Sequence, residues 1–509
     1  MKVFLLSTSF IFICLVSAAQ PTIEWAESLG GSLDDWAYAI EETSDNGYIV
    51  AGYSESNDGD LNSNNGGSDA WVIKLNNLGG IVWETSLGGS LNDLLEDIHQ
   101  TSDGGYITAG YSHSSDGDVS SNAGGSDLWV VKLSSLGVIE WENTYGGSAD
   151  DLASEIKQTA DGGYMVIGIS GSTDGDVSGN LGANDYWIVK LDITGVVQWE
   201  KSLGGSLGDE AYSFQQSSDG GYIITGYSSS NDGDVTASNG LGDYWTVKID
   251  SIGNIQWETS LGGSAEDWAE SVQQTNDGGY ILAGYAESTD GDVSGNLGLS
   301  TYWIAKLSSI GTLEWEKSLG GAANDWAFSI QQTNDGGYSV AGVSESVDGD
   351  VSSNIGGNDF WLAKINDVGN MEWEKSLGGT SIDWAFSHQQ TSDGGWIIAG
   401  FSSSADVDVS SNNGGNDVWI VKLASFIGID ELQNNLISIY PNPSTSMVNV
   451  NIDESYKGMK YFITDVTGKK IEQGRLHEIS NSIDVSHLEP GIYSFHIQQK
   501  QFSIKILKQ

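Results

Sequence analysis

Short runs of alternating apolar and polar residues dominate this chain, and clusters of Gly, Asp, Asn and Ser separate the runs. One unit of the pattern contains four such runs, at residues 36–43, 47–54, 69–76 and 80–87. Val, Ile, Tyr and Trp fill many of the apolar positions, proline is absent from the runs, and no helical periodicity is present. The pattern therefore predicts four short antiparallel strands in each unit and an all-β fold.

The four-strand unit recurs every 58 residues without an insertion or a deletion. The series opens on the fourth run, at residues 23–30, and closes on the third run of a unit that spans residues 383–423. An open array would leave a bare strand edge at each end, whereas these two partial units complete one another. We therefore predict a seven-bladed β-propeller over residues 20–424, in which the N-terminal strand closes the last blade. The period is marked by two series of tryptophans: Trp71, Trp129, Trp187, Trp245, Trp303, Trp361, Trp419 and Trp25, Trp83, Trp141, Trp199, Trp257, Trp315, Trp373.

The first nineteen residues have the features of a secretory signal peptide. Lys2 provides the charged start, residues 3–16 the apolar stretch, and residues 17–19 the small-residue cleavage site. The one cysteine, Cys14, lies inside this segment, so the exported chain is expected to contain no disulfide. No later apolar stretch is long enough for a transmembrane span.

The formal net charge is −50, and the repeats carry almost all of the acidic excess without a single arginine. Such a surface repels nucleic acids and anionic polysaccharides, so we expect neither as a partner. We expect a monomer. Within the repeats, the lysine of each third run, such as Lys74, is expected to pair with the glutamate of the fourth run, such as Glu84. Ala26 replaces that glutamate in the first segment, so Lys422 would pair with Glu24 or Glu27.

A catalytic site needs a constellation of residues that a regular repeat rarely offers. The repeats contain three histidines, His99, His113 and His388, at three different positions of the unit, and no known hydrolase motif. We therefore expect no enzymatic activity. A polysaccharide hydrolase with a pair of carboxylates is the alternative, because acidic residues occur throughout the repeats.

The loop between the second and third strands carries an Asp-Gly-Asp segment followed by Asn and Asp. Hard oxygen ligands at this spacing suit calcium, which takes six to eight oxygens. The other interpretation is that Asp and Asn only cap turns through the backbone. The candidate calcium ligands in the first two blades are Asp58, Asp60, Asn64, Asp69, Asp116, Asp118, Asn122 and Asp127.

One position in the first strand breaks the sevenfold symmetry. It is tryptophan in four adjacent blades and Leu94, Leu152 or Glu210 in the others. Exposed tryptophans beside carboxylates suit stacking on a neutral sugar ring, whereas buried tryptophans would only pack one blade on the next. The candidate ligand-binding residues are Trp36, Trp268, Trp326 and Trp384 with the preceding Asp35, Asp267, Asp325 and Asp383.

Two resemblances add to this interpretation. The segment VIKLNNLGGIVWE, residues 72–84, resembles the tryptophan-docking repeats of quinoprotein-type and kelch-like propellers, without their irregular active-site loops. The segments ISIYPNPSTSMVNV (437–450), FITDVTGKKI (462–471) and LEPGIYSFHI (488–497) resemble the type A C-terminal sorting domain of the type IX secretion system. The second resemblance implies that residues 437–509, after a linker at 425–436, form a small Ig-like β-sandwich.

The sorting-domain resemblance also implies a cellular location and a partner. In Bacteroidota, the type IX machinery recognises such domains at the outer membrane and usually cleaves them, so the passenger is released or attached to the cell surface. We therefore expect an extracellular or outer-membrane surface protein that acts as a binding module for a glycan or a protein. The alternatives are a structural calcium-binding surface protein and, third, a polysaccharide hydrolase.

Overall fold

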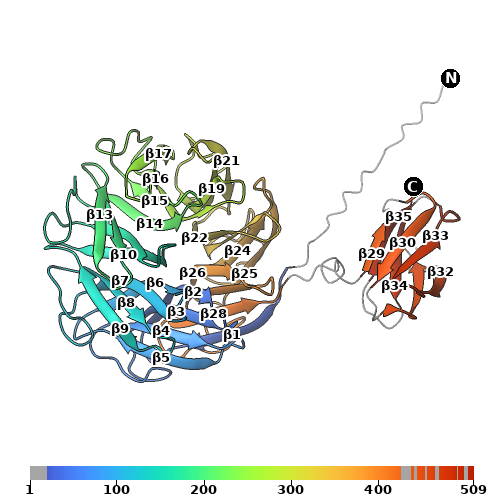
Figure 1. Cartoon of the computed structure of the whole chain (residues 1–509), viewed down its shortest axis with the longest axis horizontal. Helices are drawn as coiled ribbons and strands as arrows, with labels where there is room; N and C mark the ends of the chain where they lie inside the picture. The colour runs from blue at the N-terminus through green and yellow to red at the C-terminus, as the bar shows by residue number, and fades with distance from the viewer. Residues whose placement is uncertain are drawn as a thin grey trace. The chain divides into compact units, whose positions relative to one another are not determined.

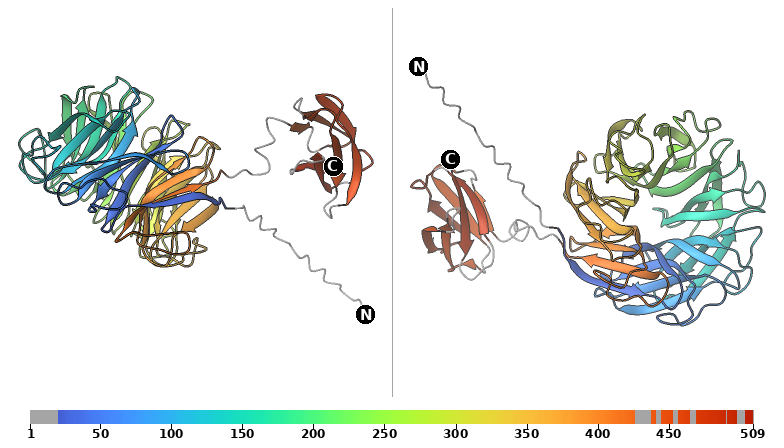
Figure 2. Two further views of the ribbon diagram at one scale, coloured as in Figure 1. Left: turned by 90° about the horizontal axis from the view of Figure 1, so that it is seen from below. Right: turned by 180° about the vertical axis from the view of Figure 1, so that it is seen from behind.

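The structure is a computed structural model that describes residues 20–425, 437–440, 444–452, 456–464, 469–489, 491–497 and 503–508. The expected signal peptide, residues 1–19, and nearly all of the expected linker lie outside the described residues. The chain divides into two compact units, Met1–Ser425 and Phe426–Gln509. Each unit is built from β-strands (Figures 1 and 2).

The first unit contains seven four-stranded antiparallel sheets arranged around a common centre (Figure 1). This arrangement confirms the predicted seven-bladed propeller. The innermost strands are β2 (Asp35–Glu42), β6 (Asp93–Gln100), β10 (Asp151–Gln158), β14 (Asp209–Gln216), β18 (Asp267–Gln274), β22 (Asp325–Gln332) and β26 (Asp383–Gln390). The second strands are β3 (Tyr48–Ser54), β7 (Tyr106–Ser112), β11 (Tyr164–Ser170), β15 (Tyr222–Ser228), β19 (Tyr280–Ala286), β23 (Tyr338–Ser344) and β27 (Trp396–Ser402). The third strands are β4 (Asp69–Leu75), β8 (Asp127–Leu133), β12 (Asp185–Leu191), β16 (Asp243–Ile249), β20 (Thr301–Leu307), β24 (Asp359–Ile365) and β28 (Asp417–Leu423).

The outermost strand of the last blade comes from the other end of the propeller. Strand β1 pairs antiparallel with β28, so that Trp25 lies opposite Lys422 and Ser28 lies opposite Trp419. In Figures 1 and 2 the blue β1 accordingly runs beside the orange strands of the last blade. The predicted closure is thus confirmed, and it gives every blade four strands. The outermost strands are β1 (Ile23–Leu29), β5 (Ile81–Leu87), β9 (Ile139–Tyr145), β13 (Val197–Leu203), β17 (Ile255–Leu261), β21 (Leu313–Leu319) and β25 (Met371–Leu377).

The two tryptophan series form the core between blades. Trp71 and its equivalents on the third strands are at most 1% exposed. On the outermost strand, Trp83 meets Tyr106 of the next blade edge-on, with ring centroids 5.8 Å apart. Trp83 also lies against Gly137, where a Cβ atom would come within 2.8 Å of the indole and where φ is +76°. These contacts explain why the repeat keeps tryptophan and glycine at these positions.

The buried lysine of each third strand pairs with a carboxylate in the turn between the first and second strands. Lys74 Nζ lies 3.0 Å from Asp45 and donates to the carbonyl of Leu75. Glu84 instead accepts a 3.0 Å hydrogen bond from the indole N–H of Trp71. The expected Lys74–Glu84 pair was therefore wrong, because both side chains have other partners on their own sides of the sheet. Lys422 does reach Glu24, at 3.5 Å, in addition to Asp393 at 3.0 Å.

The second unit has two sheets that share one hydrophobic core. The core includes Val448, Ile463 and Phe495, each 0% exposed. Among the residues that the structure describes, no helix has the length and apolar character needed to cross a lipid bilayer. One sheet has the order β29 (Ile437–Tyr440), β30 (Met447–Ile452), β33 (Ser480–Asp484), and the other has the order β32 (Lys470–Arg475), β31 (Lys460–Thr464), β34 (Gly491–Ile497), β35 (Ser503–Lys508).

Candidate ligand-binding channel

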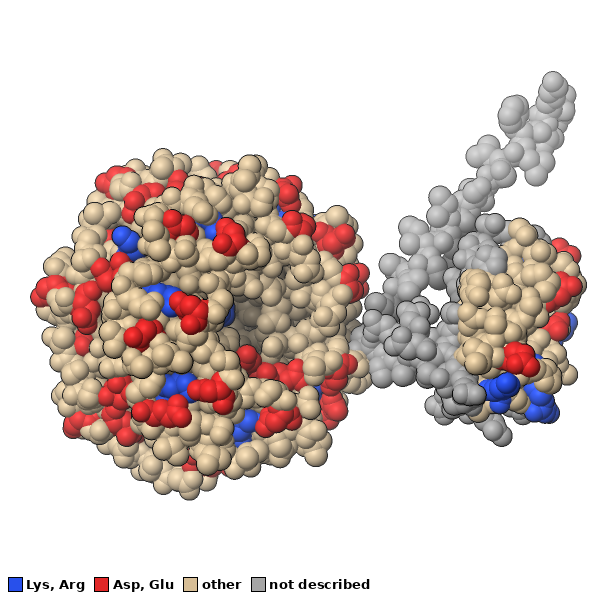
Figure 3. All heavy atoms as spheres, viewed as in Figure 1, with Lys and Arg blue, Asp and Glu red and all other residues tan. Residues whose placement is uncertain are grey.

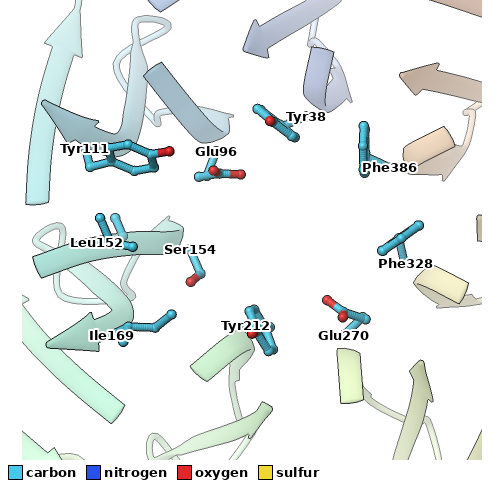
Figure 4. A pocket seen from close by; sticks show the side chains of 11 residues that line it. Tyr38, Glu96, Tyr111, Leu152, Ser154, Ile169, Tyr212, Glu270, Phe328 and Phe386 are labelled. Atoms are coloured by element: carbon cyan, nitrogen blue, oxygen red, sulfur yellow. The ribbon is translucent and has the colours of Figure 1, made fainter. Parts of the chain in front are cut away.

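The innermost strands carry a β-bulge that redirects one side chain in every blade. In the first blade the pairing register of β2 with β3 shifts between Ala37 and Ala39, so that Tyr38 is the extra residue. The same shift occurs in the other six innermost strands. A bulge re-aims its side chain, and here the fourth residue of each innermost strand points into the centre of the propeller (Figure 4).

These seven side chains form what we call the channel ring. The ring lines a cavity of about 350 Å³, together with residues such as Tyr111, Leu152 and Ile169. Aromatic side chains from three adjacent blades occupy one side: the centroids of Tyr38 and Phe386 are 5.1 Å apart, and those of Phe386 and Phe328 are 5.3 Å apart. The members of the ring are Tyr38, Glu96, Ser154, Tyr212, Glu270, Phe328 and Phe386.

The polar side of the channel ring contains two carboxyl groups. Burial and, to a lesser degree, neighbouring acidic groups such as Asp97 beside Glu96 raise the pKa of both Glu96 and Glu270 to about 8. Neither carboxyl has a hydrogen-bond or ion-pair partner among the described residues. Both groups are therefore protonated at neutral pH and can donate a hydrogen bond to a molecule in the channel.

A layer of charged residues lies deeper in the channel. His99 lies 3.4 Å from Glu41 and 3.2 Å from Asp97, and these carboxylates raise its pKa to about 10. The Asp97 carboxylate also accepts 2.9 Å hydrogen bonds from the N–H groups of Ile98 and Ile156. Asp97, His99 and Glu155 are close enough to hold a metal ion. However, a cationic imidazole has no free lone pair for a metal, and Glu155 is paired with Lys157. The arrangement is therefore an ion-pair network.

The four candidate tryptophans lie next to the channel ring, half-buried between blades. Trp36 stacks on Phe401 at 4.1 Å, and Trp268 stacks on Tyr227 at 4.1 Å. Trp326 and Trp384 meet edge-on at 5.4 Å. These contacts fit the packing interpretation, because each tryptophan contacts a ring from the preceding or following blade.

The aspartates that precede the tryptophans do not face the channel. Asp35, Asp267, Asp325 and Asp383 are 0% exposed. Asp35 accepts hydrogen bonds from the Gly31 N–H and from the hydroxyls of Ser54 and Ser56. Their burial contradicts their assignment to a sugar-binding site, because their oxygens lie inside their own blade, where those of Asp35 hold together two strands and a connection.

The candidate calcium ligands of one loop each form hydrogen bonds with different partners. Asp58 accepts from the Ser32 N–H at 2.7 Å, and Asp60 accepts from the Gly30 N–H at 3.1 Å. Asn64 bridges the carbonyls of Ser54 and Gly67. In the second blade, Asp116, Asp118, Asn122 and Asp127 make the equivalent contacts. These hydrogen bonds are those of the turn-capping interpretation for Asp58, Asp60 and Asn64, and calcium binding within a single loop stays a prediction.

The comparison that bears on export concerns the second unit. Residues 438–509 match the model of the secretion system C-terminal sorting domain. This segment is a C-terminal sorting domain. The sorting domain confirms the resemblance to type IX secretion proteins of Bacteroidota and directs the chain to the cell surface or the exterior. It also makes the secretion machinery a partner of this chain.

Three further proteins resemble the chain at low sequence identity. Regulatory protein FlaEY of Caulobacter vibrioides is 28% identical over 167 residues, which cover 30% of this chain and 17% of FlaEY. The solved structure of PorZ, a surface component of the type IX secretion system of Porphyromonas gingivalis, has a TM-score of 0.44 and 12% identity, covering 94% of this chain and 60% of PorZ. The Neurospora crassa Pan2 WD40 domain has a TM-score of 0.43 and 11% identity, covering 77% of this chain and 94% of that domain.

Six of the seven ring residues are aromatic or acidic, yet the ring was not predicted from the sequence. The expected site was placed two residues earlier, at the position of Trp36. Strict alternation predicts that the second and fourth residues of an innermost strand, such as Trp36 and Tyr38, share a face. The residue type at the fourth position varies more among the blades than that at the second. That variability was the signal that could have identified the ring.

Proposed function

We propose that this protein is a secreted or surface-attached binding module whose channel ring binds a neutral, hydroxyl-rich ligand, with a glycan as the best candidate. The observation that carries this proposal is the two-sided ring: three adjacent aromatic side chains face two protonated carboxyls across one cavity (Figure 4). Aromatic faces pack on the apolar faces of sugars, and carboxyl, hydroxyl and phenol groups bond their hydroxyls.

The charge of the protein favours a neutral ligand. Acidic side chains are spread over the blades around the hollow centre in Figure 3, and the repeats contain no arginine to bind an anion. A negatively charged ligand would be repelled on approach. The cavity of about 350 Å³ is also recessed, which suits a small molecule or a chain end better than the flat surface of a protein.

The state of the carboxyls supports binding without turnover. A glycosidase uses one protonated and one ionised carboxyl group to cleave its substrate. Here the pKa of Glu96 and that of Glu270 are both about 8, so neither supplies an ionised base or nucleophile at neutral pH. Incubation of the protein with neutral polysaccharides is expected to release no product, and product release would contradict this part of the proposal.

The proposal can be tested by screening the exported protein on an array of neutral glycans and titrating a hit by calorimetry. Phe386→Ala removes one face of the ring and is expected to weaken binding at least about tenfold, or about 1.4 kcal/mol. Leu78→Ala is the matched control, because Leu78 is 71% exposed on a blade turn away from the ring. Equal affinity of wild type and Phe386→Ala would overturn the proposal. Trp326→Ala tests in the same titration whether the tryptophans also contact the ligand.

A further inference from the structure

Carboxylates from two blades converge where neighbouring blades meet. At each such junction, the first residue of one blade's third strand lies beside two residues of the next blade. These are the first residue of its innermost strand and an aspartate in the loop between its second and third strands. The six junctions with three aspartates are Asp69–Asp93–Asp118, Asp127–Asp151–Asp176, Asp185–Asp209–Asp234, Asp243–Asp267–Asp292, Asp359–Asp383–Asp408 and Asp417–Asp35–Asp60.

The junction between the last two blades shows the geometry. The position that a Cβ atom would take on Gly378 lies 2.6 Å from Asp359 Oδ1 and 2.6 Å from Asp383 Oδ2. The two oxygens therefore face one another beside this glycine. Asp408 Oδ2 accepts a 3.4 Å hydrogen bond from the N–H of the same glycine, so the third carboxylate lies beside the pair.

One oxygen at each of these junctions is buried without a partner. It is Oδ1 of the first aspartate, which is at most 1% exposed and has no hydrogen-bond donor among the described residues. Buried polar atoms of this kind are rare, and here the same atom is unpaired in six different blades. The six atoms are Oδ1 of Asp69, Asp127, Asp185, Asp243, Asp359 and Asp417.

The other contacts of these carboxylates are those of anions. Asp359 Oδ2 accepts from the Ile355 N–H at 2.7 Å. Asp383 accepts from the Gly379 N–H and from the hydroxyls of Ser402 and Ser404. Every partner is a donor, which favours the ionised forms, while burial and the charge of the facing Asp383 raise the pKa of Asp359 to about 7. The two side chains can be ionised together only with a compensating cation between them, and no lysine or arginine contacts either of them within the described part of the chain.

The seventh junction differs in a way that supports this argument. Thr301 takes the place of the first aspartate, and its hydroxyl donates a 2.7 Å hydrogen bond to the carbonyl of Leu319. No unpaired carboxylate oxygen is left there among the described residues. Among the seven junctions, the unpaired oxygen is therefore found where two buried carboxylates meet.

We propose that each of the six junctions binds one calcium ion between the two facing carboxylate oxygens, so that the ions clamp neighbouring blades together. Water completes the coordination, because calcium takes six to eight hard oxygens in a flexible geometry. The third aspartate lies too far from the pair to share the ion without a shift of its side chain. Magnesium fits less well, since it demands near-ideal octahedral geometry. This proposal does not depend on the ligand of the channel.

The test is the number of calcium ions bound per chain, measured by equilibrium dialysis of the EDTA-treated full chain at millimolar free calcium. Thr301→Asp is expected to add one ion to the wild-type number, and the matched control Thr301→Ser is expected to add none. Asp359→Asn is expected to remove one ion. Calcium is also expected to raise Tm, whereas magnesium at the same concentration raises it less.

Three results would overturn the proposal. They are no calcium uptake by the wild type, the same number of ions in wild type and Thr301→Asp, and uptake of magnesium in preference to calcium. Because Thr301→Asp gains a site while Asp359→Asn loses one, misfolding of either variant leaves the other to decide.

Discussion

The backbone N–H of Ser392, in the last blade, donates a 2.7 Å hydrogen bond to the carboxylate of Glu42, in the first blade. The same contact links every other pair of neighbouring blades, but there a glutamine side chain is the acceptor. A continuous ring of hydrogen bonds thus passes through all seven blades and closes at Glu42. The six equivalent pairs are Ser44–Gln100, Ser102–Gln158, Ala160–Gln216, Ser218–Gln274, Asn276–Gln332 and Asn334–Gln390.

The hydrogen bond from Ser392 to Glu42 predicts different outcomes for two substitutions of Glu42. Glu42→Gln restores the residue of the other six blades and keeps the acceptor, so the free energy of unfolding should stay within about 0.5 kcal/mol of wild type. Glu42→Ala removes the acceptor and should cost about 1 kcal/mol. Urea unfolding measures both values. Equal stability of Glu42→Ala and wild type would show that the contact does not stabilise the closure.

The closing strand β1 lacks one contact that the other outermost strands make. In six blades a glutamate of the outermost strand accepts a hydrogen bond from the buried tryptophan, as Glu84 does from Trp71. Ala26 occupies this position opposite Val421, beside Trp419. We predict that Ala26→Glu raises the free energy of unfolding by about 1 kcal/mol. Ala26→Gln is the control for charge. A lower Tm for Ala26→Glu would contradict the prediction.

His388 predicts a pH dependence of stability. It is 2% exposed between Ser339 and Ser329, and burial lowers its pKa to about 3. The unfolded chain takes up a proton near pH 6.5 but the folded chain does not, so stability falls as the pH drops from 6.5 towards 3. The slope from this group is about 1.4 kcal/mol per pH unit.

The matched control for His388 follows from the repeat. Four blades have isoleucine at the position of His388, as in Ile98, and five have isoleucine at the position of Ser339, as in Ile49. The variant His388→Ile/Ser339→Ile should therefore keep its packing and lose this part of the pH dependence. Calorimetry at pH 7.5 and pH 5.5 compares the two proteins. An equal loss of stability in both on acidification would show that His388 does not titrate as described.

Most of the fold could be predicted from the sequence because the period and the phase are both visible in it. The tryptophan series gives the number of blades, and the partial units at residues 23–30 and 383–423 give the closure. The partner of Lys74 could not be predicted in this way. The sequence places Lys74 and Glu84 on neighbouring strands, but only the packed structure shows that the Asp45 carboxylate in the turn lies 3.0 Å from the ammonium group of Lys74.

The candidate site was only partly accessible to sequence reasoning. Broken symmetry correctly drew attention to the innermost strands, but the bulge at Tyr38 decides which side chains line the cavity. Burial could not be judged either, so Asp35 was predicted to bind a ligand although it is 0% exposed. The junction of Asp69 with Asp93 depends on contacts between blades, which a repeat unit taken alone does not contain.

The two protonated carboxyls of the channel ring predict how ligand affinity depends on pH. The pKa of Glu96 and of Glu270 is about 8, so both groups donate hydrogen bonds below that pH and lose the proton above it. We predict that the affinity for a neutral glycan is constant from pH 6 to 7 and falls about tenfold by pH 9.5.

Replacement of both groups by amides separates this effect from general unfolding. The variant Glu96→Gln/Glu270→Gln keeps hydrogen-bond donors at every pH, so its affinity should be the same at pH 7 and pH 9.5. Calorimetric titration of both proteins at the two pH values is the measurement. An affinity that is constant in the wild type would contradict a role for these carboxyls.

A crystal structure of the exported protein with a bound neutral glycan would show whether the ligand lies inside the channel ring. We predict electron density for a sugar ring packed against Phe328 and Phe386, with its hydroxyls directed at Glu270. Density on the outer turns or the rim loops, with only solvent between Tyr38 and Glu270, would contradict it.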